Sequence, residues 1–448
     1  MEPESETLSA GGPLWSGRLA GGLDPFLLGF SRSLPVDRAL FAYDVRASIV
    51  HVRMLGRQGL IEQADADALA TALAGLEPPP ADAPDEDIHS YLERRLVEQL
   101  GPLGRRVHAG RSRNDQISVA TRLWAKDACR RLVGLVGELQ AGLVEAARAA
   151  PTVVLPAYTH LQRAQPVLLG HYLAAHAWAF ARDDDRLRHA FEAADVSTLG
   201  AGAVAGSSLP LDPVWTAGEL EFAAAFTNTI DAVSDRDFVC DLLYACTMAF
   251  VHLSRFGEEV IIYTSQEFGL AQLDDRVALG SSMMPQKKNP QIAEHLRGRA
   301  GIAIGRLTGF LAVVKGLPLA YDSDLQEDKE AVFGQVAALE GALVAAALLV
   351  RSLHFDAERA AALAGDGWCV ATDVAEALVR DGMPFREAHD HVASRVAAGE
   401  RFSEPTPEAA VAARSLPGGT SPDRVAEQLV ALDRRIAATR TFSLAAAG

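Results

Sequence analysis

The chain has 448 residues, more than one hydrophobic core usually supports, so two or three structural units are expected. Hydrophobic residues make up 49% of the sequence and charged residues 22%, which is the balance of an ordinary water-soluble globular protein. The formal net charge of −16 would repel nucleic acid and anionic membranes, so neither is expected as a partner. A small anionic substrate would then need locally placed cations.

The region up to about residue 110 is predicted to contain short helices and loops. Prolines interrupt it at residues 78–80, at Pro84 and at Pro102. The first six residues are acidic and lack the positive end and apolar stretch of a signal peptide. We therefore expect a cytoplasmic protein whose N-terminal helical domain spans residues 1–110.

The middle of the chain is predicted to form long helices, because proline is absent from residues 103–150, 214–284 and 319–383. Apolar residues recur there at the three-to-four spacing of one helical face, whereas alternating strand patterns are scarce. The segments with this spacing are 117–150, 165–194, 235–268, 290–311 and 327–353. The expected fold is all-α, with a central bundle of five long helices over residues 111–356.

Several features inside this bundle support its packing. Gly134, Gly137 and Gly142 interrupt the first apolar face and indicate a close approach of helices. The most apolar stretch, 341–350, is too short to cross a bilayer and is predicted to be buried in the bundle. Residues 357–448 are expected to form a small C-terminal helical domain.

The cysteines indicate a reducing compartment. None of the four has CxxC spacing, and all lie in apolar, helix-like sequence. They are Cys129, Cys240, Cys246 and Cys369. We expect them to be buried thiols.

The segment 280–290 reads GSSMMPQKKNP and combines small hydroxyl residues with a helix start. Asn289 before Pro290 predicts an N-cap followed by proline at the first helical position. The free N–H groups of such a start, preceded by two lysines, would bind a carboxylate. Ser281 or its neighbour could be a reactive hydroxyl. A solvated loop with ordinary lysines is the alternative interpretation.

His160 is a candidate acid or base, because it lies in the string AYTHLQRAQP at 157–166, just ahead of a predicted helix. A hydrogen-bonded structural histidine is the alternative. A carboxylate partner would favour catalysis, and Glu294 lies in the first turns after the serine loop. The spacing leaves open whether the two side chains meet.

Two strings concentrate anion-binding groups, HAGRSRNDQ at 108–116 and DAVSDRD at 231–237. Each contains arginine, which binds carboxylates in a bidentate manner. The alternative for both is a salt-bridge network, in which Asp115 or Asp235 neutralises the neighbouring arginine.

Nucleotide and metal motifs are not supported. The string GAGAVAG at 200–206 resembles a dinucleotide loop, but its last glycine is one place late and no strand precedes it. His389 and His391 are two residues apart and would point away from each other on a helix. No HExxH motif occurs. We expect neither a cofactor nor a metal ion.

Taken together, these strings resemble the argininosuccinate lyase family of the fumarase/aspartase superfamily. The resemblance extends from LWSGR at 14–18 to GGT at 418–420. Its most specific pieces are EDIH at 86–89, GRSRNDQ at 110–116, YTHLQRAQP at 158–166, DAVSDRDF at 231–238, the 280–290 string and LPLAY at 317–321 with DLQEDKE at 324–330. It implies a homotetramer with a twenty-helix core, in which each active site is shared among three subunits.

The resemblance also implies an activity, the reversible β-elimination of argininosuccinate to arginine and fumarate in the last step of arginine biosynthesis. Ser281 would remove the proton from the carbon next to a carboxylate, and His160, oriented by Glu294, would help protonate the departing guanidinium nitrogen. Lys287 and Asn289 would stabilise the aci-carboxylate intermediate. The positions that match substrate-binding residues are Ser33, Asp37, His89, Arg113, Asn114, Thr159, Arg236, Tyr321, Gln326 and Lys329.

Three places depart from the family pattern. Ala109 and Leu279 stand where threonine is usual, and Asp322 with Ser323 replaces asparagine and a basic residue. A lyase that releases fumarate from another N-substituted aspartate is therefore the alternative within the same reaction class. A catalytically silent structural relative is a further alternative, which the intact catalytic set disfavours. A nucleotide- or nucleic-acid-binding module is disfavoured by the acidic charge.

Overall fold

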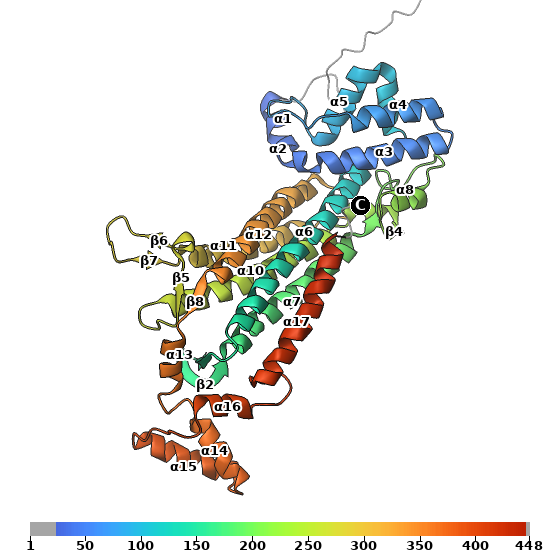
Figure 1. Ribbon diagram of the computed structural model, residues 1–448. Coiled ribbons are helices and arrows are strands. Elements are labelled where there is room, and N and C mark those ends of the chain that lie inside the picture. Colours follow the sequence, from blue (N-terminus) through green and yellow to red (C-terminus); the bar gives the residue numbers. More distant parts are fainter. Residues whose placement is uncertain (1–23, 445–448) are drawn as a thin grey trace, which may run out of the picture. The chain divides into compact units, whose positions relative to one another are not determined.

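The computed structural model describes residues 24–444, so the string LWSGR at 14–18 lies outside the described part of the chain. The fold is predominantly helical, as expected, with short strands in the connections (Figure 1). Two compact units form. Unit 1 comprises the chain up to Lys126, Ala193–Phe238 and Ala312–Glu330, and unit 2 comprises Asp127–Glu192, Val239–Leu311 and the chain from Ala331. This grouping does not test the boundaries predicted near residues 110 and 356, because long helices run through both units.

The prediction of five long helices is confirmed. They are α6 (Arg113–Ala149), α7 (Leu169–Ala194), α10 (Asp237–Thr264), α11 (Gln291–Val314) and α12 (Glu327–Arg351). The predicted start of the second helix at residue 165 is wrong, because residues up to Leu168 belong to a strand. Apolar periodicity alone does not separate a short buried strand from the helix that follows it.

Unit 1 contains short helices around the first turns of α6. Its helices and strands are α1 (Pro25–Ser31), α2 (Leu34–Asp37), η2 (Arg38–Leu40), α3 (Phe41–Arg57), α4 (Gln63–Ala74), α5 (Ile88–Leu100), η3 (Gly101–His108), β3 (Val196–Ser197), α8 (Pro213–Glu219), β4 (Ala224–Ala225), α9 (Thr229–Ser234) and η5 (Ser323–Gln326). Side chains of α3, α6 and α8 meet in one apolar core, which includes Val50, Leu123 and Leu220. This core holds the start of α6 in place.

Unit 2 contains most of the long bundle and the helices that follow it. Its remaining elements are β1 (Val154–Thr159), β2 (Gln162–Leu168), β5 (Ala271–Leu273), η4 (Asp275–Val277), β6 (Leu279–Gly280), β7 (Lys288–Asn289), β8 (Leu353–Phe355), α13 (Ala357–Ala364), α14 (Ala371–Arg380), α15 (Phe385–Ala397), α16 (Pro407–Ala413) and α17 (Pro422–Leu444). The strands pair as β1 with β2, β5 with β8 and β6 with β7, all antiparallel. Each pair shapes a connection between helices.

Glycines allow the helices of unit 2 to approach closely. A Cβ on Gly137 would lie 2.8 Å from Thr439 Cγ2 of α17, as the interrupted apolar face of α6 predicts. A Cβ on Gly257 of α10 would lie 2.7 Å from the backbone oxygen of Ala293 on α11. A contact with backbone cannot be relieved by a side-chain rotation, so Gly257 fixes the spacing of α10 and α11.

The cysteine prediction is correct for three of the four residues. Cys129, Cys246 and Cys369 are buried, whereas Cys240 is partly exposed, and none of the four is in a disulfide. Burial raises the pKa of Cys129 to about 12 and that of Cys369 to about 11. These two thiols are therefore unreactive packing groups at neutral pH.

Within the described residues 24–444, two helices are long and apolar enough, by length and composition, to cross a membrane. They are α10 and the segment Ser323–Arg351, and 61% and 50% of their most apolar windows are buried in the structure. Core helices of a bundle meet the same criterion.

We expect Gly257→Ala to lower the midpoint of thermal unfolding, because the added methyl group overlaps backbone of α11 and such overpacking costs about 1–3 kcal/mol. Gly218→Ala on the exposed face of α8, where a Cβ would meet nothing within 4 Å, is the matched control and should leave the midpoint unchanged or raise it. Equal midpoints for the two variants would contradict this account of helix spacing.

Candidate active site

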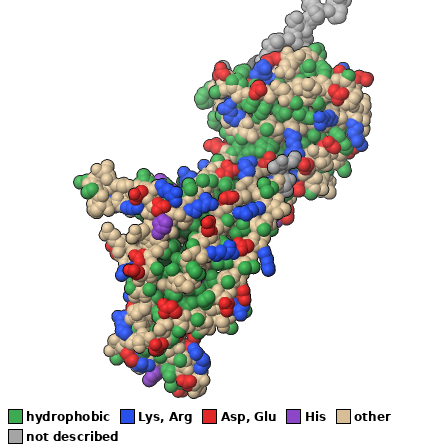
Figure 2. Space-filling model, in the orientation of Figure 1, with side chains coloured by type: hydrophobic (Ala, Val, Ile, Leu, Met, Phe, Trp, Pro, Cys, Tyr) green, Lys and Arg blue, Asp and Glu red, His purple; other side chains and the backbone are tan. Residues whose placement is uncertain are grey.

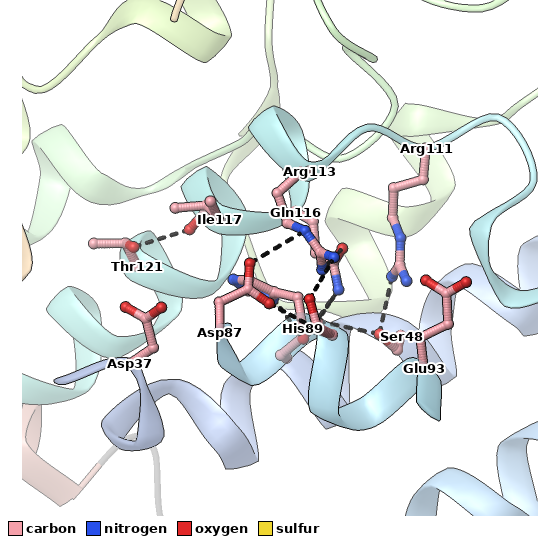
Figure 3. Close-up of polar contacts among 12 residues, drawn as sticks. Asp37, Ser48, Asp87, His89, Glu93, Arg111, Arg113, Gln116, Ile117 and Thr121 are labelled. Carbon is pink, nitrogen blue, oxygen red and sulfur yellow. Dashed lines mark hydrogen bonds and ion pairs between the residues drawn. The ribbon is translucent and has the colours of Figure 1, made fainter. Parts of the chain in front are cut away.

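A buried histidine–carboxylate pair lies at the centre of the polar residues of unit 1 (Figure 3). His89 Nδ1 on α5 is 2.7 Å from Asp44 Oδ2 on α3, and both side chains are buried. Gln116 Nε2 on α6 donates to both oxygens of Asp44, at 2.9 and 3.0 Å. These contacts fix the plane of the imidazole ring.

The charges around this pair keep the Asp44 carboxylate ionised. Burial alone would raise the pKa of Asp44, but His89, Arg111 and Gln116 together hold it well below its usual value. His89 Nε2, the other ring nitrogen, is buried and has no hydrogen-bond partner. A buried imidazole nitrogen without a partner is ready to bind a polar ligand group.

The first turn of α6 contributes a cation and an amide beside His89. Arg113 Nη2 donates to Ser90 Oγ at 3.2 Å, and Arg113 Nε lies 3.4 Å from Asp87 Oδ2. Figure 3 shows Arg113, Asp87 and His89 pointing toward one another. Asn114 Nδ2 donates to the carbonyl oxygen of Ala203 at 3.1 Å. The helix therefore begins with a guanidinium and an amide, two side chains that can bind an anion.

A second set of buried charges lies in the same unit. Lys329 is 2% exposed, and its Nζ lies 3.3 Å from Asp328 Oδ1 and 3.8 Å from Asp37 Oδ1. Lys329 also donates to Gln326 Oε1. Arg236 Nε donates to Asp328 Oδ2 at 2.6 Å. These charges are almost completely removed from water, so each needs its partners.

Asp37 is the least satisfied member of this set. Ser33 donates to its Oδ2, whereas its Oδ1 is buried without a hydrogen bond. Burial raises the pKa of Asp37, and the charges of Lys329 and His89 oppose that shift. Tyr321, whose pKa burial raises to about 12, is a neutral hydroxyl in the field of Arg236 and Asp37. Unit 1 thus gathers the residues predicted to bind substrate, except Thr159 and Asn289.

The serine loop belongs to unit 2 and projects from its bundle (Figures 1 and 2). Strands β6 and β7 form its stem, where Leu279 pairs with Asn289 and Gly280 with Lys288. Ser281 Oγ accepts hydrogen bonds from the backbone N–H groups of Met283, at 3.3 Å, and Met284, at 3.0 Å. Lys287, the last residue before β7, is exposed.

The predicted helix start after this loop is displaced by one residue. Asn289 was expected as the N-cap, but it belongs to β7, and α11 begins at Gln291. The carbonyl oxygen of Pro290 accepts the N–H of Glu294 at 3.2 Å, which gives Pro290 the capping position. Strand pairing with Leu279 displaces Asn289 from the role that local sequence favours.

His160 lies in a two-residue turn between β1 and β2. Thr159 pairs with Gln162, and both residues between them have left-handed backbone, with φ of 55° at His160 and 56° at Leu161. Hairpin turns of this kind normally use asparagine and glycine, so the turn is strained. His160 and Leu161 are exposed at the tip.

Within residues 24–444 of a single chain, the structure does not bring the catalytic set together. His160, Lys287 and Glu294 are exposed on separate segments of unit 2, and no hydrogen bond joins His160 to Glu294 or Ser281. A cavity of about 570 Å³ in the same unit, between α6, α7 and β8, contains none of the predicted residues. The position of this cavity therefore does not locate the candidate active site.

Several site residues were not predicted. Asp87 and Gln116 lie inside strings that had been recognised, and Asp328 lies inside DLQEDKE, so their motifs contained a signal. The sequence contained no such signal for Asp44, because it lies within an amphipathic helix and belongs to none of the recognised motifs.

The three departures lie at identifiable places. The carbonyl oxygen of Ala109 is 3.0 Å from His51 Nε2, and Leu279 is exposed in β6. Asp322 precedes η5, and its Oδ2 is buried without a hydrogen-bond partner.

Comparisons with known proteins agree with these observations. The chain matches the sequence profile of the family described as Lyase over residues 17–305 and that of Argininosuccinate lyase C-terminal over residues 368–415. It is 47% identical to argininosuccinate lyase of Acidothermus cellulolyticus, covering 97% of this chain and 96% of that protein. Argininosuccinate lyase of Frankia casuarinae is 48% identical, covering 94% of this chain and 97% of that protein.

Solved structures show the same fold. EDDS lyase in complex with formate superposes with a TM-score of 0.82 at 26% identity, covering 95% of this chain and 92% of that one. The 3-carboxy-cis,cis-muconate lactonizing enzyme from Pseudomonas putida superposes with a TM-score of 0.69 at 20% identity, covering 94% and 100%. Because two curated relatives share almost half of their residues with it over nearly their full length, the chain belongs to the argininosuccinate lyase family.

Proposed function

We propose that this protein is a carbon–nitrogen lyase that cleaves argininosuccinate to arginine and fumarate, the last step of arginine biosynthesis. The observation that carries the proposal is the near full-length identity to curated argininosuccinate lyases, at 47% and 48%. The cations of unit 1, Arg113, Arg236 and Lys329, are the groups that a substrate with several carboxylates needs. We also propose a cytoplasmic location, where the buried thiols of Cys129, Cys246 and Cys369 would stay reduced.

Ser281 is the proposed base. It removes a proton from the carbon next to a carboxylate of the succinyl part, and the electron pair moves into that carboxylate as an aci-carboxylate. The intermediate then collapses, forming the carbon–carbon double bond of fumarate and breaking the bond to nitrogen. A serine hydroxyl is a weak base, but the N–H groups of Met283 and Met284 already point at its oxygen and would stabilise the alkoxide.

The other catalytic roles follow from charge and position. Lys287 and Asn289 would stabilise the doubly charged intermediate, because they flank the serine loop. His160, oriented by Glu294, would protonate the departing guanidinium nitrogen. The strain of the His160 turn supports a functional role, since strained backbone of this kind persists where a side chain must be presented.

A shared site in a homotetramer would unite these residues. The single chain exposes apolar side chains on its long helices, including Tyr244 on α10, Ile302 and Ile304 on α11, and Val344 and Leu348 on α12. Figure 2 shows hydrophobic surface along the bundle between charged side chains. Apolar helix faces of this kind pack in larger helical cores. We propose that they form the twenty-helix core, with Thr159 and His160, Ser281 and Arg113 coming from three subunits.

A second candidate is a lyase of the same mechanism that acts on another N-substituted aspartate. The buried Oδ2 of Asp322, which has no hydrogen-bond partner, favours it, because this carboxylate stands where the family pattern has asparagine and would present a different charge to the substrate. A solved structure at 26% identity over 95% of this chain is named EDDS lyase rather than argininosuccinate lyase, which supports keeping a second substrate open.

Ser281→Ala should lower the rate of fumarate release from argininosuccinate by roughly 10²- to 10⁴-fold, because the base is lost. Ser282→Ala, at the exposed neighbouring hydroxyl, is the control and should retain most of the activity. Unchanged turnover in Ser281→Ala would contradict the assigned chemistry. The rate is followed by the absorbance of fumarate.

Coexpression of His160→Asn with Arg113→Gln should restore part of the activity that each variant lacks alone, because some mixed tetramers contain intact sites. Coexpression of Arg113→Gln with Asn114→Ala should restore nothing, since both residues lie in one turn of α6. Equal results for the two pairs, measured as fumarate release by the purified mixtures, would count against a shared site.

His160→Gly should be more stable than His160→Ala by about 1 kcal/mol, because glycine tolerates the left-handed backbone and alanine does not. Both variants lose the imidazole, so both should lose most of the activity. Denaturant midpoints of the two proteins measure the difference. A more stable alanine variant would disprove strain in this turn.

A further inference from the structure

The glycine string at 200–206, which the nucleotide interpretation left without a role, binds an anion that belongs to the chain itself. Both oxygens of Asp115 accept backbone N–H groups. Asp115 Oδ2 accepts from Gly200 and Gly202, each at 3.0 Å, and Oδ1 accepts from Ser112 at 2.9 Å. The carboxylate is completely buried. A phosphate-binding loop offers its N–H groups to a ligand, whereas this loop offers them to a side chain of unit 1.

The loop conformation requires glycine. Gly200 has φ of 103° and Gly202 φ of 65°, both in the left-handed region. A Cβ on Gly202 would lie 2.7 Å from the backbone oxygen of Gly206, and a Cβ on Gly200 would lie 2.9 Å from Pro213 Cγ. A residue with a Cβ at either position would therefore strain or displace this form of the loop, in which two N–H groups converge on one oxygen.

The same loop touches three segments of unit 1 that bear residues predicted to bind substrate. The carbonyl oxygen of Ala203 accepts from Asn114, next to Arg113. Ala201 packs with Ala232 and Val233, three residues before Arg236, and with Ala320, which precedes Tyr321. The loop is thus a common support behind these side chains.

We propose that Asp115 is a positioning residue, whose bond to the Gly200–Gly202 backbone holds Arg113 and Asn114 in place to bind a carboxylate of the substrate. The inference rests on the proposed function. Asp115 itself is buried behind the helix start and touches no substrate. Its role is to join the first turn of α6 to the loop.

The ionised form of Asp115 depends on the loop. Burial raises the pKa of Asp115 to about 6, and the N–H groups of Gly202 and Gly200, with the charge of Arg111, oppose that shift. Removing either the Asp115 carboxylate or the N–H groups of the loop would leave buried polar groups without hydrogen-bond partners, which lowers the stability of the fold. The loop and the helix start are therefore coupled.

A helix cap is the simpler interpretation, because Asp115 Oδ1 accepts the N–H of Ser112 and Ser112 Oγ accepts that of Asn114 at 3.2 Å. This reciprocal arrangement is that of a capping box. The capping box accounts for the contact of only one carboxylate oxygen of Asp115, Oδ1. The other oxygen is bonded to residues more than eighty positions away in the sequence, so the two interpretations make different predictions for a change in the loop.

The test compares steady-state kinetics of Asp115→Asn and Gly202→Ala in the full-length protein with argininosuccinate. Asparagine would direct an NH₂ group at one set of N–H donors, and alanine at 202 would displace the loop without changing α6. Both variants should raise KM by roughly tenfold or more, the effect of losing about 1.4 kcal/mol of binding, with kcat changed by less than about threefold. Asp184→Asn, at a buried carboxylate of unit 2 that accepts from Thr439 and Arg188, should lower stability but leave KM unchanged.

A KM close to that of the wild type in folded Asp115→Asn would overturn the proposal. So would a raised KM in Asp115→Asn alone, because Asp115 would then act as a helix cap. If Asp115→Asn does not fold, Gly202→Ala decides by the same criterion. A wild-type protein that releases no fumarate would refute the proposed function instead, and the Kd of fumarate for the same variants would then test the inference.

Discussion

The need to pair buried charges shapes unit 1 more than any other constraint. Asp44, Arg236, Asp328 and Lys329 are each less than a tenth exposed, so none can rely on water to stabilise its charge. These residues and their partners come from α2, α3, α5, α6, α12 and the segment before α10, so the pairing fixes the arrangement of these elements. Asp37 Oδ1 and His89 Nε2 are buried in this network without a hydrogen bond. A network that is rigid and leaves such atoms unsatisfied is preorganised for a ligand.

The residues proposed to bind the substrate and those proposed to carry out the chemistry lie on different kinds of structural element. Arg236 and Lys329 of unit 1 are buried and Arg113 is partly buried, whereas Ser281, Lys287 and His160 lie on an exposed loop and a strained turn of unit 2. Rigid elements position a substrate accurately, and segments with few contacts can move when it binds. The division explains why a single chain has a well-ordered anion site and no assembled catalytic set. The exposed apolar faces of α10, α11 and α12 are the surfaces proposed to form the tetramer. In that proposal, association of subunits brings the substrate-binding residues and the catalytic residues together.

The sequence predicted the fold well because helical periodicity is a local property. All five long helices were found, with errors where a strand or a loop continues the apolar pattern, as at residues 165–168. The site was less predictable. The left-handed turn at His160 and Leu161 contradicts local preference, because neither residue is glycine. Asp44 has no motif, and its role depends on His89, forty-five residues away. The glycine string was not assigned a nucleotide, and its contact with Asp115 is one that only folding reveals.

The identity of the leaving amine is the central chemical claim, since reaction type and fold follow from the family, whereas Ala109, Leu279 and Asp322 depart from its pattern. The most direct measurement is kcat/KM for fumarate release from argininosuccinate and from a panel of other N-substituted aspartates. We predict that kcat/KM is highest for argininosuccinate. Rapid release of fumarate from another member of the panel, with none from argininosuccinate, would contradict it.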